Sequence, residues 1–153
     1  MTDERVRVVV SESEEETLAI AADLARDLRA GDVVHLSGDL GSGKTHFAKG
    51  LAAGLGLDPG SIRSPTFAFI DVHAGREGGL GLVHVDLYRV ASDSELAELG
   101  LEELPGPDAV AAIEWPERLP AGALPRARVR MEDLGGATSH RGTIDASACL
   151  PCK

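Results

Sequence analysis

The sequence predicts a single α/β domain in which helices flank a mixed central sheet with antiparallel strands at its edges. Short apolar runs alternate with helix-patterned segments along most of the chain. The run at residues 33–37 leads through a glycine-rich loop directly into a helical pattern. Two strand-like segments, 127–132 and 140–146, close the chain, and we expect them to pair antiparallel.

The composition suits one domain with one hydrophobic core. The chain has 153 residues, of which 43% are apolar, and its 18 Gly and 8 Pro indicate many turns. No apolar run approaches the ~18 residues that a membrane span requires, and the N-terminus lacks the apolar core of a secretory signal. We therefore expect a cytoplasmic protein without membrane contact, with its domain in residues 1–147 and a disordered tail in 148–153.

The first predicted elements are a strand and a helix. Residues 5–10 are rich in Val and indicate a strand. Either Ser11 or Ser13, each with a Glu three residues later, forms a capping box that starts the helix. Gly31 stands where a C-cap glycine is expected. The apolar positions recur at helical spacing: Leu18, Ala21, Ala22, Ala25 and Leu28.

The following elements frame the glycine-rich loop. Residues 33–37 form a short apolar run that is typical of a buried parallel strand. After the loop, a helix is expected to end around Gly54–Gly56, with Pro59 beyond it. The buried stripe of this helix consists of Phe47, Leu51 and Leu55.

The second half of the chain is predicted to contain a hairpin, a short helix and a buried strand. Residues 66–73 and 80–88 are strand-like and are joined by a turn-rich link, which favours a hairpin. Ser92 with Glu95 forms a capping box before a helical segment. The apolar run at 109–115 predicts a buried strand that stops at a proline.

The glycine-rich loop matches the pattern of a phosphate-binding loop. Gly38, Gly43, Lys44 and Thr45 fit G-x-x-x-x-G-K-[ST]. Glycines let backbone N–H groups converge on a triphosphate, and the following helix directs its N-terminus at the anion. We expect Lys44 to reach the β- and γ-phosphates and the Thr45 hydroxyl to ligate Mg²⁺. The alternative is a glycine-rich turn without a ligand.

The loop, in this strand and helix context, predicts a P-loop NTPase that binds ATP or ADP with Mg²⁺. Histidines at 35 and 46 flank it, and we expect them to be packed residues and not catalytic groups. Asp39 is expected to have a structural role. The candidate nucleotide-binding residues are Gly38, Asp39, Leu40, Gly41, Ser42, Gly43, Lys44, Thr45, His46 and Trp115.

A P-loop protein also needs a carboxylate at the end of a neighbouring strand to hold Mg²⁺. Asp86 ends an apolar run and is the best candidate, although it could instead cap the next segment. Glu114 also follows an apolar strand and could polarise the attacking water or complete the metal site. Its alternative is a surface position. Trp115, the only tryptophan, could line the site or pack in the core.

Residues 63–67, RSPTF, have the composition of a loop that could sense phosphate. Thr66 offers a hydroxyl for the γ-phosphate or Mg²⁺, and the preceding Pro65 stiffens the approach. We therefore include Thr66, with Lys44 and Glu114, among the candidate catalytic residues. The Ser-Pro-Thr pattern by itself is common in loops.

The net charge of −10 argues against a large direct nucleic-acid surface, because proteins that grip phosphates present a clustered basic face. If the protein acts on RNA, we expect it to act through a partner. At the C-terminal end, Cys149 and Cys152 form a C-x-x-C pair without a following helix or a second pair. A frayed tail is the simplest interpretation, and a redox or shared-metal role is the alternative.

Taken together, LSGDLGSGKTHFAKGL, IRSPTF, HVDLYR and IEWPERL resemble the bacterial tRNA threonylcarbamoyladenosine biosynthesis ATPase family (TsaE) in order and in chain length. The resemblance implies a small P-loop ATPase that hydrolyses ATP slowly by itself. It implies two partners, the threonylcarbamoyl transferase and its paralogous subunit, which install the modification on adenosine 37 of tRNAs that read codons beginning with A. The transferase moves the group, and tRNA is contacted indirectly.

By the same resemblance, Lys44 and Thr45 bind phosphate and Mg²⁺, and Asp86 is the metal aspartate. Glu114 and Trp115 form the functionally important acid-aromatic pair, with Glu114 also a candidate metal ligand. Two alternatives stay open: a small-molecule kinase, which would need an acceptor pocket and an arginine lid, and a nucleotide-gated binding module that hardly hydrolyses ATP.

Overall fold

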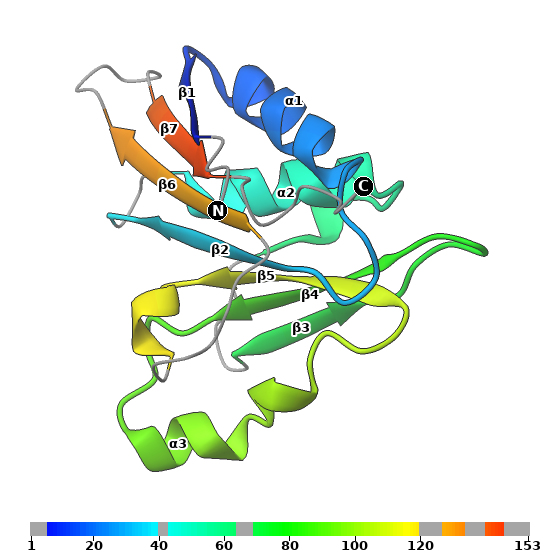
Figure 1. Cartoon of the computed structure of the whole chain (residues 1–153), viewed down its shortest axis with the longest axis vertical. Helices are drawn as coiled ribbons and strands as arrows, with labels where there is room; N and C mark the ends of the chain where they lie inside the picture. The colour runs from blue at the N-terminus through cyan, green and yellow to red at the C-terminus, as the bar shows by residue number, and fades with distance from the viewer. Residues whose placement is uncertain (1–5, 40–42, 64–68, 120–126, 134–139, 146–153) are drawn as a thin grey trace, which may run out of the picture.

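A seven-stranded mixed sheet forms the centre of the computed structural model, which describes residues 6–39, 43–63, 69–119, 127–133 and 140–145. The strands lie in the order β1-β7-β6-β2-β5-β4-β3 (Figure 1). In chain order they are β1 (Val6–Ser11), β2 (Val33–Gly38), β3 (Ile70–His73), β4 (Gly81–Asp86), β5 (Ala109–Glu114), β6 (Ala127–Asp133) and β7 (His140–Asp145).

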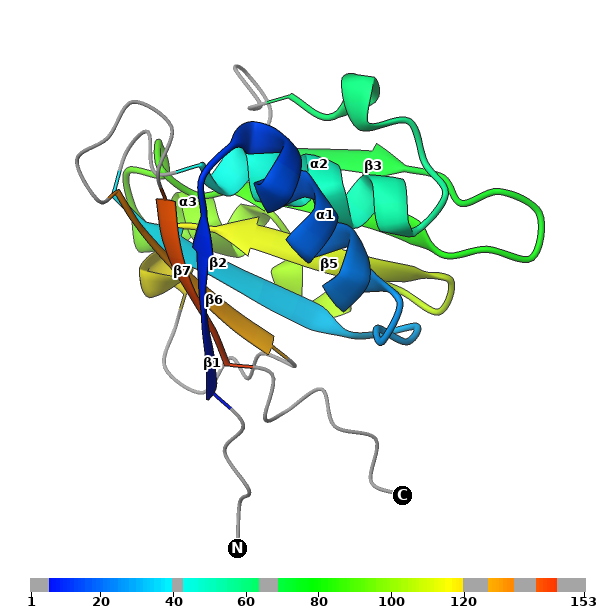
Figure 2. The same ribbon diagram turned by 90° about the horizontal axis from the view of Figure 1, so that it is seen from above.

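The helices connect these strands at both faces of the sheet. They are α1 (Glu14–Ala25), α2 (Lys44–Gly54) and α3 (Asp93–Glu98), with 3-10 turns η1 (Pro59–Ser61), η2 (Leu101–Glu103) and η3 (Pro116–Arg118). Helices α1 and α2 cover one face, and α3 lies on the opposite face (Figures 1 and 2). Within the described residues, no helix has the length and apolarity needed to cross a bilayer.

The pairing pattern confirms the predicted mixed sheet with antiparallel edges. Strands β6, β2, β5 and β4 are mutually parallel in that order. β3 pairs antiparallel with β4, as the predicted hairpin, and β6 pairs antiparallel with β7. β7 also pairs antiparallel with β1, so the first strand of the chain forms an edge beside the last. The predicted closing pair, β6 and β7, therefore lies between β1 and β2 in the sheet.

The sheet separates two apolar clusters. The larger one lies under α1 and α2 and includes alternate residues of the central strands, such as Val34 and Leu36 of β2. The smaller one lies on the α3 face and includes Val83 and Val85 of β4. Because side chains alternate along a strand, His84 and Asp86 of β4 lie on the α1–α2 face.

Helix α1 starts where one of the two predicted capping boxes places it and ends earlier than predicted. Ser13 is the N-cap, and its hydroxyl accepts the Glu16 N–H at 3.1 Å. The helix ends at Ala25, not at Gly31, because the next turns tighten into i→i−3 bonds such as Leu28 N–H to Ala25 O at 3.2 Å. Gly31 has φ +92° and donates its N–H to Ala109 O of β5, so it belongs to the turn that enters β2.

Helices α1 and α2 pack at very short range through small residues. A Cβ built on Gly50 of α2 would lie 2.5 Å from Ala21 Cβ and 2.6 Å from Leu18 O. A Cβ on Gly54 would lie 2.7 Å from Ala25 Cβ. The two glycines, one turn apart on α2, therefore let the backbones of α1 and α2 approach closely. This contact holds α2, the helix that follows the phosphate loop, against the first helix of the chain.

Candidate active site

The candidate site lies at the carboxyl edge of the parallel strands, where three predicted elements converge. β4 and β5 are parallel neighbours, and their last residues, Asp86 and Glu114, are directly opposite each other in the register. β2 lies on the other side of β5 and ends at Gly38, where the glycine-rich loop begins. Ligands of open α/β sheets bind at this edge, where the loops meet. The sheet therefore brings the loop and both candidate carboxylates together.

The described ends of the loop have the backbone conformation that glycine permits. Gly38 has φ +148° and Gly43, the N-cap of α2, has φ +101°. The N-cap of α2 is a glycine, so among the described residues no cap side chain accepts a hydrogen bond from the N–H groups of its first turn. Such a helix start, preceded by left-handed glycines, is the arrangement that holds a phosphate group.

Lys44, the first residue of α2, folds back over this loop. Its side chain is buried, and its Nζ donates to the carbonyl oxygens of Gly38 at 2.6 Å and Asp39 at 2.9 Å. Burial lowers the pKa of the Lys44 ammonium, and the nearby carboxylates, led by Glu114, oppose that shift. A buried ammonium among carboxylates and carbonyls is a cation poised to exchange these contacts for an anionic ligand.

Trp115 completes the surroundings of this ammonium. The Lys44 Nζ lies 4.0 Å from the centre of the indole ring, a cation–π contact. The ring also packs against Tyr88, with ring centroids 4.9 Å apart. Trp115 thus contacts Lys44 and also packs against the apolar cluster on the α3 face, whereas its predicted role in nucleotide binding stays a prediction.

The backbone of Trp115 is left-handed, with φ 60° and ψ 51°. A non-glycine residue in this region costs of order 1–3 kcal/mol and persists only where its surroundings fix it. Here the Trp115 N–H donates to Leu36 O of β2 at 3.3 Å, and the ring contacts both Tyr88 and Lys44. The turn ends β5 abruptly and leaves Glu114 as the last strand residue.

Glu114 is a buried carboxylate with two partners. It is 3% exposed, so its predicted alternative as a surface residue is wrong. The Thr45 hydroxyl on α2 lies 3.4 Å from Oε1 and 3.3 Å from Oε2, as a long hydrogen bond. His84 Nε2 lies 2.6 Å from Oε2. Glu114 therefore links the helix of the phosphate loop to the neighbouring strand β4.

Asp86 ends β4 beside Glu114. Burial raises the pKa of its carboxyl group, and the negative charge of Glu114 adds to this rise, whereas the Tyr88 N–H bonded to Oδ1 at 3.0 Å opposes it. The hydrogen bond from the Tyr88 N–H closes a local turn after Asp86. This is the contact expected from the alternative prediction, in which Asp86 caps the next segment. A carboxylate whose charge is opposed by burial, and which lies beside a second carboxylate, is typical of a site that takes a cation.

The oxygen donors at this edge fit a magnesium ion. Thr45, Asp86 and Glu114 supply a hydroxyl and two carboxylates, which are the hard ligands that Mg²⁺ prefers. Among the described residues, no group of three or more His, Cys, Asp or Glu side chains could hold a metal. In general, the protein supplies only one or two ligands to Mg²⁺ in phosphate-binding sites, and phosphates and waters supply the rest.

His84 is a site residue that the sequence reasoning missed. It is fully buried in the middle of β4, where a polar residue among Leu, Val and Val is easily interpreted as core packing. The signal was its spacing. His84 and Asp86 are two residues apart on one strand and so share a face, which is the face that Glu114 also occupies.

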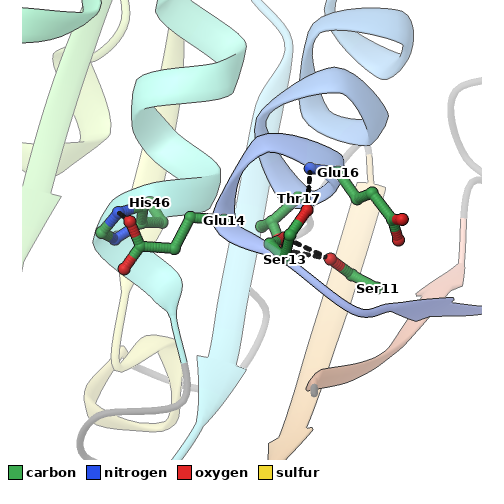
Figure 3. A network of polar contacts seen from close by, with 6 residues as sticks. All are labelled: Ser11, Ser13, Glu14, Glu16, Thr17 and His46. Carbon is green, nitrogen blue, oxygen red and sulfur yellow. Dashed lines mark hydrogen bonds and ion pairs between the residues drawn. The ribbon is translucent and has the colours of Figure 1, made fainter. Parts of the chain in front are cut away.

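The histidines that flank the loop have other contacts. His46 Nε2 lies 3.2 Å from Oε2 of Glu14, so its imidazole contacts the start of α1 (Figure 3). The same figure shows the polar cluster that fixes this end of α1, in which the Ser11 and Thr17 hydroxyls lie 2.7 Å apart. His35 lies on β2 opposite Arg128 of β6. Neither histidine contacts Glu114 or Asp86 in any described hydrogen bond or ion pair.

Several predicted residues lie outside the described part of the chain. They are Leu40, Gly41 and Ser42 of the loop, Thr66, and the cysteine pair Cys149 and Cys152. Their predicted roles remain predictions.

Comparison with known proteins identifies relatives over most of the chain. A family model described as threonylcarbamoyl adenosine biosynthesis protein TsaE matches residues 11–141. A tRNA threonylcarbamoyladenosine biosynthesis protein TsaE from Treponema pallidum (strain Nichols) is 43% identical over 116 residues, covering 76% of this chain and 82% of the relative. The protein of the same name from Streptomyces coelicolor is 42% identical over 118 residues, covering 76% and 78%.

A solved structure agrees with these relatives. The crystal structure of YdiB from Bacillus subtilis superposes with a TM-score of 0.66 at 33% identity, over 94% of this chain and 87% of that one. The family match contains the glycine-rich loop, β4 and β5, and therefore every described residue of the candidate site. The chain belongs to the TsaE family of tRNA threonylcarbamoyladenosine biosynthesis proteins.

Proposed function

We propose that this chain is a P-loop ATPase that supports the threonylcarbamoyl transferase and its paralogous partner subunit. Together they form N6-threonylcarbamoyladenosine at position 37 of tRNAs that read codons beginning with A. The chain hydrolyses ATP to ADP and phosphate and does not itself transfer the group. Its membership of the TsaE family supports the pathway, and the site supports the chemistry.

The observation that carries the proposal is the convergence of a buried lysine, a threonine and two carboxylates at one edge of the sheet. Lys44 is already desolvated and charge-compensated, so an incoming phosphate oxygen replaces the Gly38 and Asp39 carbonyls as its acceptor. Because its side chain is buried, this cation stabilises charge on the transferring phosphoryl group more strongly than it would in solution. Lys44 therefore both binds ATP and lowers the barrier.

Mg²⁺ would be held by the Thr45 hydroxyl and the Asp86 carboxylate, with Glu114 beside them. When bound, the ion neutralises charge on the β- and γ-phosphates. The raised pKa of Asp86 fits this role, because a carboxylate that burial has destabilised gains most from a neighbouring cation.

Glu114 is the proposed water-orienting residue. Its carboxylate is buried and fixed by Thr45 and His84, so it can accept a hydrogen bond from a water that attacks the γ-phosphorus. Positioning of this kind contributes much of the catalysis of phosphoryl transfer, because the protein does little covalent chemistry. Loss of the carboxylate should therefore reduce turnover more than it reduces ATP binding.

The charge of the molecule supports an accessory role in the cytoplasm. A net charge of −10 opposes tight binding to a phosphate backbone, so the transferase and its partner are expected to hold the tRNA. The energy of ATP hydrolysis then reaches the tRNA through contacts between proteins.

The test is formation of the modified nucleoside on an unmodified tRNA by purified transferase, partner subunit and this chain. The wild-type chain should support many rounds of modification, whereas Lys44→Ala should support none beyond the background without this chain. Lys49→Ala, on the same helix but away from the loop, is the matched control and should behave as wild type. Equal product with wild type and Lys44→Ala would refute the proposal.

A further inference from the structure

A buried histidine with one polar partner stands behind the proposed water-orienting glutamate. His84 is fully buried, and its Nε2 lies 2.6 Å from Oε2 of Glu114. Its other ring nitrogen, Nδ1, is buried and has no hydrogen-bond partner among the described residues. Buried polar side chains are normally satisfied at all their atoms, so this half-satisfied ring suggests a role of its own.

The contact determines which ring nitrogen carries the proton. With a proton on Nδ1 alone, Nε2 and the carboxylate would be two acceptors at 2.6 Å. A proton on Nε2 satisfies the carboxylate at this distance, whereas Nδ1 has no partner among the described residues. His84 therefore donates a charge-assisted hydrogen bond to Glu114.

This bond fixes one oxygen of the carboxylate. The backbone of Glu114 is held in β5, opposite Asp86 of β4, but its side chain has three rotatable bonds. His84 restrains Oε2 from the strand side, and the Thr45 hydroxyl approaches both oxygens from α2. The carboxylate is thus confined between a strand and a helix, with its plane set by two donors.

We infer that His84 is a positioning residue for the reaction, which holds the Glu114 carboxylate turned toward Thr45 and the phosphate loop. The inference rests on the proposed function, because it assigns His84 to the ATP hydrolysis that Glu114 serves. His84 acts through Glu114 and needs no contact with the nucleotide. Second partners that orient a functional side chain in this way typically change activity roughly 10- to 100-fold when they are removed.

The kinetic test compares two substitutions of similar bulk. His84→Leu removes the donor, and His84→Gln places an amide N–H near the position of Nε2. We expect His84→Leu to lower kcat for ATP hydrolysis roughly 10- to 100-fold with little change in KM, and His84→Gln to recover most of it. In a Glu114→Gln background, His84→Leu should cause no further loss, because the two residues act as one unit. His35→Leu, on the other face of β2, is the matched control.

A spectroscopic test addresses the hydrogen bond without any turnover. In a sample labelled with ¹⁵N-histidine, the His84 Nε2 should carry a proton, and that proton should resonate far downfield of ordinary imidazole N–H signals. Glu114→Gln should move the signal back upfield. A histidine that only fills space would show neither feature.

The outcomes separate this inference from the proposed function. Unchanged kcat in His84→Leu, or equal losses in the Leu and Gln variants, would overturn the positioning role while leaving the ATPase intact. If the wild-type chain shows no turnover even with its partners, the proposed function fails and the catalytic part of the inference fails with it, whereas the NMR signal still decides whether His84 holds Glu114. A proton on Nδ1 alone, or a signal that Glu114→Gln leaves in place, overturns the inference. If His84→Leu does not fold, His84→Gln and the NMR comparison carry the test.

Discussion

The ionised carboxylate of Asp86, a residue of the candidate site, lowers the stability of the fold. Burial and the charge of Glu114 raise the pKa of its carboxyl group, so the ionised form is less favourable in the folded chain than in the unfolded one. At neutral pH the carboxylate is therefore a stability cost, which a bound cation would relieve. Such trade-offs between stability and activity are common at functional sites.

Asp86→Asn should therefore keep or raise stability while it weakens the site. The Asn Oδ1 can still accept the Tyr88 N–H, and the buried charge is gone. We expect a melting temperature no lower than that of wild type, together with weaker Mg²⁺-dependent binding of ATP. Thermal unfolding and ATP titrations with and without Mg²⁺ measure both effects. Asp71→Asn on β3 is the control, and a clear fall in melting temperature for Asp86→Asn would contradict the argument.

At the scale of residues, the sequence predicts the two carboxylates of the site better than the histidine that contacts one of them. Asp86 and Glu114 could be predicted as site residues because each follows an apolar run, where a carboxylate contributes little to packing. Their convergence could be predicted only by assuming that β4 and β5 are parallel neighbours. His84 could not be singled out, because its partner is 30 residues away in the chain and a lone histidine in a strand has many uses.

At the scale of elements, the close packing of α1 on α2 depends on glycine. Gly50→Ala should destabilise the fold, because the new methyl group would overlap Ala21 and the Leu18 carbonyl and force the helices apart at a cost of roughly 1–3 kcal/mol. The ~1 kcal/mol that Ala gains over Gly from helix propensity offsets part of this cost, so the net loss of stability is up to about 2 kcal/mol. Denaturant unfolding measures the change. Ala53→Ser, at an exposed position of α2, should stay within about 0.5 kcal/mol of wild type. A more stable Gly50→Ala variant would contradict the packing.

His35 on strand β2 makes the stability of the folded chain depend on pH. Burial, and then the charge of Arg128, lowers the pKa of the His35 imidazole from its ordinary 6.5, so folding favours the neutral ring. A group with a depressed folded pKa contributes its full stability above the unfolded pKa and loses it as the pH falls below that value. The stabilising effect of His35 is therefore present at neutral pH and declines in the acid range.

His35→Leu removes this dependence. As the pH falls from about 8 to about 5, the stability of the variant should improve relative to wild type, because the variant has no imidazole to charge at this position. Denaturant unfolding of both proteins at each pH gives the difference directly, and the other histidines cancel in the comparison. A constant difference across this range would show that the ring is equally charged in the folded and unfolded chains.

Local sequence patterns predict which segments form helices and strands, but they do not predict which strands pair with each other. The capping boxes at Ser13 and Ser92 start their helices, and the strand before the phosphate loop lies where its apolar run places it. The end of α1 was misplaced, because Gly31 has the left-handed backbone of a C-cap but serves the turn into β2. The pairing of β1 with β7 joins the two ends of the chain, and no local pattern specifies such a contact.

At the scale of the whole molecule, the sheet is a scaffold that brings short segments to one edge. The phosphate loop, the end of β4 and the end of β5 come from distant parts of the chain and meet only because β2, β5 and β4 are parallel neighbours. The antiparallel strands at both sides extend this core without adding described residues to the site. With a net charge of −10, the molecule suits a role beside RNA-binding partners more than on RNA itself.

The central claim is that this edge of the sheet hydrolyses ATP in the service of partner proteins. The most direct test is steady-state ATP turnover by the purified chain, with and without the transferase and its partner subunit, beside Lys44→Ala. We expect slow turnover by the chain itself, a clear change when both partners are added, and no turnover above background in Lys44→Ala. Turnover that is indifferent to the partners, or that survives the loss of the Lys44 ammonium, would contradict it.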